Sequence, residues 1–233
     1  MDLHLTDRVA IVTGSSRGLG LAAARALAAE GCLVTICARH ADALQASAAI
    51  VAADAGDASR VLQVVADVST PDGAAAVVEQ TMAARGRLDV LVNNVGKAGG
   101  GGIEAATDRD WQDAIDQTLF PAVRMSRLAL PHLRHSDAAV ILMIASIWGR
   151  ESGGRLTYNA VKAAEISLAK AMEHELAPQG IRVNSIAPGS IAFEGGSWWR
   201  SQQEDPQGMA EFVQREIPSG RFGRPEEVSN LDA

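Results

Sequence analysis

The amino-acid sequence predicts an α/β fold in which helices cover both faces of a parallel, doubly wound sheet, giving three layers. Two observations lead to this expectation: short apolar runs recur along the chain, and longer helical patterns separate them. The runs are apolar throughout rather than alternating, which is typical of strands buried on both faces. Strand–helix alternation favours parallel strands joined by right-handed crossovers. A chain of 233 residues fits one domain, so we expect residues 1–233 to form a single unit.

The apolar runs and the helical patterns set the expected order of elements. Strands are expected at residues 9–13, 33–37, 61–66, 90–92, 140–144 and 183–187. Helices are expected at residues 20–30, 41–54, 72–85, 108–134 and 157–177. Ligands of such sheets bind outside the carboxyl ends of the strands, so the residues that follow each strand are the candidates for a site.

Composition narrows the class of partner. The net charge, 21 − 28 = −7, argues against nucleic acid or an anionic membrane as the main partner. No apolar run is long enough to span a bilayer, and residues 1–7 lack the apolar core of a signal peptide. Cys32 and Cys37 lie at the two ends of one expected strand, which separates them too far for a disulfide. We therefore expect free thiols in a reducing cytoplasm, and no metal, since no histidine has ligand spacing with acids or cysteines.

The first expected strand ends in a glycine-rich turn. Gly14, Gly18 and Gly20 follow residues 9–13 and lead into an alanine-rich helix. A helix N-terminus presents free N–H groups and the positive end of its dipole, which suits a phosphate, and glycines let a ligand approach the backbone. The spacing G-x-x-x-G-x-G differs from the commoner G-x-G-x-x-G fingerprint. Such a turn can also merely end a strand, so residues later in the sequence must decide whether it binds a phosphate.

Tyr158 and Lys162 are four residues apart on an expected helix and so share a face. Free tyrosine has a pKa of about 10 and is a poor acid or base near neutrality. A neighbouring ammonium favours the phenolate, and lowering a tyrosine pKa by about 3 units takes about 4 kcal/mol. Such a tyrosine is a general acid/base suited to neutral pH. Ser146 follows the fifth strand, where its hydroxyl can hold the reacting oxygen of a substrate, although Tyr-x-x-x-Lys alone is common as a solvated pair.

The motifs gain weight from their order and spacing. They are Thr13-Gly14-x-x-x-Gly18-x-Gly20, Asp67-Val68, Asn93-Asn94-Val95-Gly96, Ser146, Tyr158-x-x-x-Lys162 and Pro188-Gly189. On these motifs the chain resembles the short-chain dehydrogenase/reductase family, and within it members similar to 3-oxoacyl reductases. The resemblance extends from Leu5 to about Val228. It implies a Rossmann-type oxidoreductase that exchanges a hydride between a nicotinamide cofactor and an alcohol or carbonyl substrate.

The resemblance also implies a role for each residue of the site. Tyr158 is the implied acid/base, Lys162 lowers its pKa and binds the nicotinamide ribose, and Ser146 orients the substrate oxygen. Asn93 is expected to be a structural hydrogen-bonder that ties strands together. The predicted cofactor-binding residues are Gly14, Ser16, Arg17, Gly18, Leu19, Gly20, Arg39, Asp67, Val68, Asn94, Gly96, Tyr158, Lys162, Pro188, Gly189 and Ile191.

The charges near the end of the second strand predict NADP(H) as the cofactor. NAD-dependent enzymes usually carry an acid there for the ribose 2′-hydroxyl, whereas arginine suits a 2′-phosphate. Here Arg39 follows the strand and no acid occurs before Asp42. Arg17 in the glycine turn is a second cation, and guanidinium groups make charge-assisted bonds to phosphate. The alternative is that both arginines are simply solvated.

The chain departs from the family pattern at three places. Thr118 stands where the family has an asparagine that helps hold a water beside the catalytic lysine, so it is a doubtful fourth catalytic residue. Phe193 stands where the family often has a threonine that bonds the nicotinamide carboxamide. In this chain the backbone alone, or Ser190, would then make that bond. The sequence ends shortly after Val228, without the family's last helix and seventh strand, which predicts the sixth strand as an exposed edge.

The segment 190–222 is the predicted substrate lid. Its apolar residues include Trp198, Trp199 and Phe212, which suit either a partly hydrophobic substrate or packing against core or a partner subunit. The family resemblance implies a homo-oligomer, a dimer or tetramer, and residues 111–133 are the expected interface. The short C-terminus leaves undecided whether the chain forms the tetramer.

Three functions remain to be weighed. The leading one is an NADP(H)-dependent carbonyl reductase or alcohol dehydrogenase. The second is a non-catalytic nucleotide-binding protein of the same fold, which is favoured by Thr118 and the short C-terminus. The third is a methyltransferase-like protein, which explains the glycine turn but leaves Ser146, Tyr158 and Lys162 without a role.

Overall fold

The computed structural model describes residues 3–229 and contains one parallel sheet. Its six strands, in the spatial order β3-β2-β1-β4-β5-β6, are β1 Val9–Thr13, β2 Leu33–Ala38, β3 Val61–Val65, β4 Val90–Asn93, β5 Val140–Ile144 and β6 Arg182–Ile186. Every neighbouring pair is parallel. The predicted doubly wound α/β class is therefore confirmed, and each strand lies within one residue of its expected bounds. Within residues 3–229, β3 and β6 are the outer strands of the sheet.

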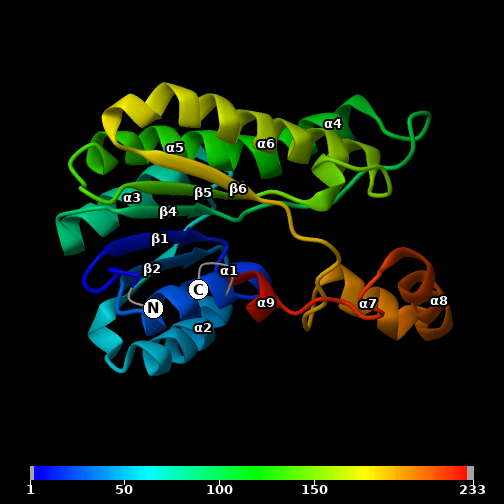
Figure 1. The fold of residues 1–233 in the computed structure, drawn as a ribbon, viewed down its shortest axis with the longest axis horizontal. Coiled ribbons are helices and arrows are strands. Elements are labelled where there is room, and N and C mark those ends of the chain that lie inside the picture. The colour runs from blue at the N-terminus through cyan, green and yellow to red at the C-terminus, as the bar shows by residue number, and fades with distance from the viewer. Residues whose placement is uncertain (1–2, 230–233) are drawn as a thin grey trace.

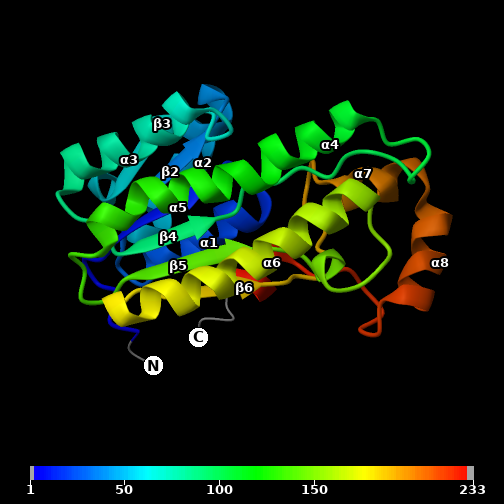
Figure 2. The same ribbon diagram turned by 90° about the horizontal axis from the view of Figure 1, so that it is seen from above.

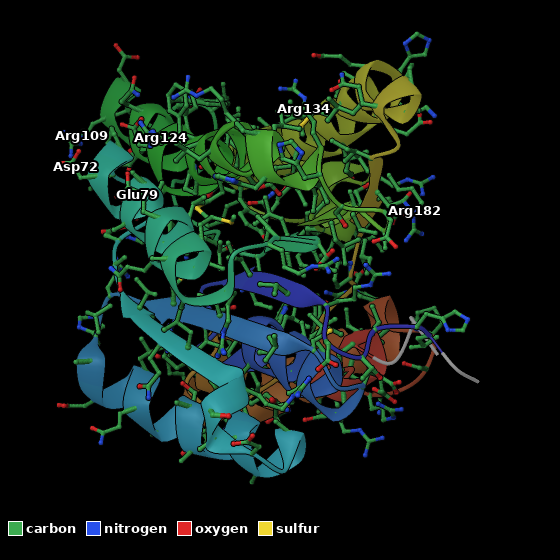
Figure 3. The ribbon with its side chains drawn as sticks, turned by 90° about the vertical axis from the view of Figure 1, so that its left-hand side faces the viewer. Asp72, Glu79, Arg109, Arg124, Arg134 and Arg182 are labelled. Atoms are coloured by element: carbon green, nitrogen blue, oxygen red, sulfur yellow. The ribbon has the colours of Figure 1, made fainter. Side chains whose placement is uncertain are left out.

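Helices cover both faces of this sheet. They are α1 Gly18–Ala29, α2 Ala41–Ala55, α3 Pro71–Arg85, α4 Asp108–Ala114, α5 Phe120–Leu133, α6 Leu156–Leu176 and α9 Pro225–Ser229. Figure 1 shows α3, α5 and α6 over one face, and α1, α2 and α9 over the other. The side view agrees, with the labelled Glu79 on α3, Arg124 on α5 and Arg134 just after α5 all on one side of the sheet (Figure 3). None of the helices within residues 3–229 is long and apolar enough to cross a membrane.

The core forms because consecutive strand residues point to opposite faces. In β1, Val9 and Ile11 join the cluster under α3, α5 and α6, whereas Ala10 and Val12 join the cluster under α1 and α2. All five residues of β1 are buried. This two-sided burial explains why the strands read as continuous apolar runs in the sequence.

The expected single helix at residues 108–134 is wrong in one respect. The structure divides it into α4, a π-helical turn at Ile115–Leu119, and α5. Pro121 lies in the first turn of α5, and its ring nitrogen has no hydrogen to donate to the preceding turn. A wider turn accommodates the missing bond, and such π turns are frequent at functional sites. Thr118 lies inside this turn and is buried.

The segment 193–222 contains two helices that the sequence pattern did not predict, α7 Ser197–Glu204 and α8 Pro206–Glu216. Figures 1 and 2 show them beyond the carboxyl ends of the strands, apart from the layered body. The two ends of segment 193–222 meet at a β-bridge, where the N–H of Ala192 donates to the carbonyl of Gly223 at 2.9 Å. The segment therefore leaves the body of the protein and returns at one place.

Candidate active site

Lys162 and Tyr158 lie together near the N-terminal end of α6. The Nζ atom of Lys162 is 5.7 Å from the centroid of the Tyr158 ring. The ammonium also donates a hydrogen bond of 2.8 Å to the carbonyl of Ile144, the last residue of β5. Only 3% of the Lys162 side chain is exposed, whereas Tyr158 is half-buried. The predicted pair is thus packed against the carboxyl end of the sheet and is not a solvated surface pair.

Ser146 lies on the turn that follows β5. Its hydroxyl oxygen accepts a hydrogen bond of 3.2 Å from the N–H of Trp148 and so begins the short helix Ile147–Gly149. Gly149 in that helix lies against α6: a Cβ there would stand 2.7 Å from the carbonyl carbon of Lys162. The N–H of Ile147 donates to the carbonyl of Pro188 after β6 at 2.9 Å. These contacts hold the turn of Ser146 against the helix of Tyr158 and Lys162.

Thr118 lies beside Lys162 but turns its hydroxyl toward a loop. Its Oγ1 accepts a hydrogen bond of 3.2 Å from the N–H of Lys97. Gly96 fits between it and Lys162: a Cβ on Gly96 would lie 3.0 Å from Nζ and 3.3 Å from the Thr118 methyl group. Thr118 therefore supports the loop after β4 at the edge where the predicted site lies.

Glu165 is a member of this cluster that the sequence reasoning missed. Its Oε2 accepts a hydrogen bond of 2.7 Å from Nζ of Lys162, and each side chain is only 3% exposed. Burial raises the pKa of the Glu165 carboxyl, and the charge and hydrogen bond of Lys162 oppose this only in part. The signal in the sequence was an acid three residues after the lysine, on the same helix face.

The glycine turn is fastened to β4 by Asn94. Its side-chain amide donates to the carbonyls of Thr13 at 2.9 Å and Gly14 at 3.2 Å. Asn93 points to the helix layer, where its amide donates to the hydroxyl of Ser126 on α5 at 3.1 Å. The expectation that Asn93 ties strands together is wrong, because its amide bonds to a helix; the residue that ties neighbouring strand ends together is Asn94. Its predicted contact with the cofactor stays a prediction.

The N-terminal end of α1 is suited to an anion. Arg17 occupies the N-cap position without a side-chain cap, and the first turn contains no acid. The first N–H groups of the helix are therefore not satisfied by a capping side chain. Gly18 has φ +57° and so adopts a conformation that favours glycine. The predicted residues Ser16 and Leu19 belong to the same turn, with the Leu19 side chain packed into the core.

Phe193 lies against this turn. A Cβ on Gly18 would stand 2.5 Å from the Phe193 ring, so the ring rests directly on the glycine. Arg17 contributes a second link, donating to the carbonyl of Gly195 at 3.2 Å. The segment that follows Pro188, Gly189 and Ile191 is thereby held close to the glycine turn.

Asp67 and Arg39 follow β3 and β2, which are neighbours in the sheet. Burial favours the neutral form of Asp67, but hydrogen bonds from Ser69 and the positive charge of Arg39 outweigh it and lower the pKa of Asp67. Arg39 is exposed, and Val68 is buried under the turn. An acceptor and a cation thus lie next to one another at this part of the edge.

These features fit a dinucleotide. The uncapped end of α1 and its glycines suit phosphates, Arg17 and Arg39 add positive charge, and Gly96 leaves room beside Lys162. The arrangement lies where the strand order reverses between β1 and β4, the usual binding position in such sheets.

A hollow of about 490 Å³ lies at the opposite edge of the sheet, near the amino ends of the strands, lined by residues including Arg8, Arg87 and Asp137. These charged groups are paired: Arg8 with Asp137, and Arg87 with the buried Asp89. The hollow contains none of the predicted site residues.

Comparison with known proteins agrees with this geometry. Residues 8–204 match the family model described as short chain dehydrogenase. The chain is 33% identical to a 3-oxoacyl-[acyl-carrier-protein] reductase from Synechocystis sp. over 226 residues, covering 97% of this chain and 87% of the relative.

Two solved structures are also similar. One is an L-sorbose reductase from Gluconobacter frateurii complexed with NADPH and L-sorbose, with TM-score 0.93 and 34% identity, covering 99% of this chain and 90% of that one. The other is levodione reductase, with TM-score 0.89 and 32% identity, covering 97% and 89%. The sheet order, the glycine turn and the grouping of Ser146, Tyr158 and Lys162 agree with this likeness, and the chain belongs to the short-chain dehydrogenase family of oxidoreductases.

Proposed function

We propose that this protein is an NADP(H)-dependent oxidoreductase that interconverts a small carbonyl compound and the corresponding secondary alcohol. The observation that carries the proposal is the position of the buried Lys162 ammonium, 5.7 Å from the Tyr158 ring centroid at the carboxyl end of β5. The similarity to the 3-oxoacyl reductase and to the L-sorbose reductase complexed with NADPH adds support.

Tyr158 is the general acid/base of the proposed reaction. The ammonium of Lys162 favours transfer of the phenol proton because it stabilises the phenolate that remains. Ser146 holds the reacting oxygen of the substrate next to the phenol. The cofactor supplies or accepts the hydride when bound. Tyr158 gives its proton to the substrate oxygen in reduction, and its phenolate takes the proton of the alcohol when the reaction runs toward the carbonyl.

Lys162 has one hydrogen-bond donor left for a ligand. An ammonium carries three N–H donors, and two of them are used by Ile144 and Glu165. We assign the third to the nicotinamide ribose, and the backbone near Asn94 and Gly96 to the same part of the cofactor. Thr118 remains a doubtful catalytic residue, because it lacks the side-chain amide of the family's asparagine; its oxygen accepts from the loop and its proton is still available.

The remaining proposed contacts follow the strand ends. The turn from Gly14 to Gly20 would hold the phosphates, Asp67 and Val68 the adenine, and Pro188, Gly189 and Ile191 the nicotinamide. Arg17 and Arg39 would hold the 2′-phosphate. We also propose segment 190–222 as the substrate lid, a cytoplasmic location, and a dimer or tetramer.

The aromatic residues of the lid bear on the substrate. The rings of Trp198, Phe212 and Phe222 pack on one another, with centroids 4.9 Å and 5.2 Å from Trp198. They therefore serve the packing of α7 and α8. Trp199 is 37% exposed and is the lid aromatic that we propose as a substrate contact.

The test starts with fluorescence titration of the purified protein with NADPH and NADH, followed by addition of a panel of carbonyl compounds. We expect NADPH to bind and to be oxidised by at least one carbonyl, and Tyr158→Phe to lose turnover while it still binds NADPH. Binding without turnover across the panel would favour a non-catalytic nucleotide-binding protein. Binding of neither cofactor would contradict the proposal.

The choice of cofactor has its own test. In Arg39→Asp the new carboxylate repels a 2′-phosphate and accepts from a 2′-hydroxyl. We expect NADPH affinity to fall about 10- to 100-fold, the equivalent of a charged hydrogen bond, and NADH affinity to rise. Arg150→Ala, on an exposed arginine outside the predicted cofactor contacts, is the control. Unchanged affinities in Arg39→Asp would show that Arg39 is merely solvated.

A further inference from the structure

The ion pair of Lys162 and Glu165 is buried, and burial of two charges costs free energy. Removing two charges from water is expensive, and the attraction between them repays this only when geometry is good. Here the two atoms are 2.7 Å apart, both side chains are 3% exposed, and Nζ also bonds the carbonyl of Ile144. The pair lies beside the proposed catalytic tyrosine, with Nζ 5.7 Å from its ring centroid, which suggests a role beyond stability.

The same helix contains a matched pair in water. Lys170 and Glu173 have the same spacing of three residues and the same N–O distance of 2.7 Å, but their side chains are 81% and 37% exposed. Solvent screens such a pair, and exposed pairs contribute little. The contrast isolates burial beside Tyr158 as the feature that sets Glu165 apart.

The carboxylate has two effects on the site. It holds Nζ between Glu165 and Ile144, and it leaves one donor of the ammonium for a ligand. Its negative charge also offsets part of the ammonium charge that Tyr158 experiences. A lysine without this partner would favour the phenolate more strongly, and a phenolate cannot donate a proton to a carbonyl oxygen.

We propose that Glu165 is a positioning residue that fixes Lys162 and offsets its charge, so that Tyr158 stays protonated and the site is set for carbonyl reduction. This inference rests on the proposed function, because it takes Tyr158 as the proton donor. It adds a residue that the family motif does not contain.

Other charged groups near α6 do not alter the comparison between variants. The π-helical turn and α4 both pack against α6. The turn carries Asp116, and α4 carries Asp113, which pairs with Arg109 at 2.9 Å. Arg155 at the N-cap of α6 donates to the carbonyl of Gly100 at 2.9 Å. These groups are the same in wild type and in each variant, so their effects cancel in the difference.

The chain offers a direct readout, because Tyr158 is its single tyrosine. The near-ultraviolet absorbance of the phenolate therefore reports on this residue alone and needs neither cofactor nor substrate. Glu165→Gln keeps the shape and removes the charge. We expect its phenolate absorbance to develop at lower pH than in wild type, because the ammonium charge is no longer offset. Glu173→Gln is the matched control and should titrate as wild type does.

Glu165→Asp tests positioning separately, and it remains informative if Glu165→Gln does not fold. It keeps the charge but draws the carboxylate back, so the phenolate should develop at the wild-type pH while NADPH binds several-fold more weakly. An unchanged or upward shift in Glu165→Gln would overturn the charge role. Wild-type NADPH affinity in Glu165→Asp would overturn the positioning role. Failure of the proposed function would show instead as no carbonyl turnover by wild type, with the titration shift still present.

Discussion

The side-chain amide of Asn94 lies directly over Gly20, so that a Cβ on this glycine would stand 2.4 Å from Nδ2 and 2.6 Å from the carbonyl of Gly14. The glycine turn and the end of β4 can approach each other only because Gly20 has no side chain. One turn thus serves both the packing of the fold and the proposed phosphate site.

Gly20→Ala is therefore expected to destabilise the protein. The methyl group must displace the Asn94 amide, which costs about 1–3 kcal/mol, as overpacking usually does. Denaturant unfolding measures this loss, and NADPH titration should show weaker binding. Gly102→Ala is the control, since a Cβ there meets nothing within 4 Å. Equal stability of Gly20→Ala and wild type would mean that Asn94 yields without cost.

Removal of the Phe193 ring should change cofactor binding without unfolding the protein. The ring rests on Gly18 at the N-terminal end of α1, where we place the phosphates. We expect Phe193→Ala to bind NADPH more tightly, because a ligand no longer has to displace the ring. Fluorescence titration checks this, with Phe120→Ala, a partly exposed phenylalanine on α5, as control. Weaker binding would instead make the ring a contact of the cofactor.

Asp89 gives a prediction for the acid stability of the fold. Its buried carboxylate accepts from the N–H of Val9 at 2.8 Å, from Arg87 and from Ser136. Burial opposes its ionisation, but these hydrogen bonds outweigh burial and lower the pKa of Asp89. Asp89→Asn should lose about 2–3 kcal/mol at neutral pH, the range for hydrogen bonds to charged groups.

The pH dependence of this loss has a definite sign. A carboxyl whose pKa is lowered by folding stabilises the protein above its unfolded pKa of about 3.9, and loses that contribution as pH falls through the folded value. The difference between wild type and Asp89→Asn should be full above about pH 5 and shrink in more acidic solution. Asp137→Asn, on the exposed neighbour, should have a much smaller effect. A difference independent of pH would contradict the assignment.

The two cysteines should be inert in the folded protein. Both are buried and free, and burial raises the pKa of Cys32 to about 12 and that of Cys37 to about 11. The thiolate is the reactive form. Alkylation at neutral pH should therefore be slow for native protein and rapid after denaturation. Rapid labelling of Cys37 in the native protein would show that strand β2 opens readily, and rapid labelling of Cys32 would show that the turn before it does.

Local patterns were sufficient to predict most of the architecture. The strands were located because residues buried on both faces form continuous apolar runs, as in β1. The edge of the site was predictable because all parallel strands end on the same side, which brings the turn of Ser146 after β5 next to Pro188 after β6. The family motif supplied Tyr158 with a role that its position beside Lys162 supports.

Patterns failed where distant contacts decide. The helical periodicity of the side chains continues through residues 115–119. It therefore gives no sign of the backbone hydrogen bond that is lost because Pro121 has no N–H. The helices α7 and α8 depend on the rings of Trp198, Phe212 and Phe222, which meet only after folding.

The sequence by itself determined the parallel sheet, the glycine turn and the residues of the proposed chemistry, because each depends on spacing along the chain. Tertiary structure decided which polar groups meet. It gave the strand-tying role to Asn94, placed Phe193 on Gly18, and paired Glu165 with Lys162. The physical reason is burial: a carboxylate beside a lysine on a helix is ordinary in water, and the packing of α6 against β5 and the π-helical turn removes the water from this pair.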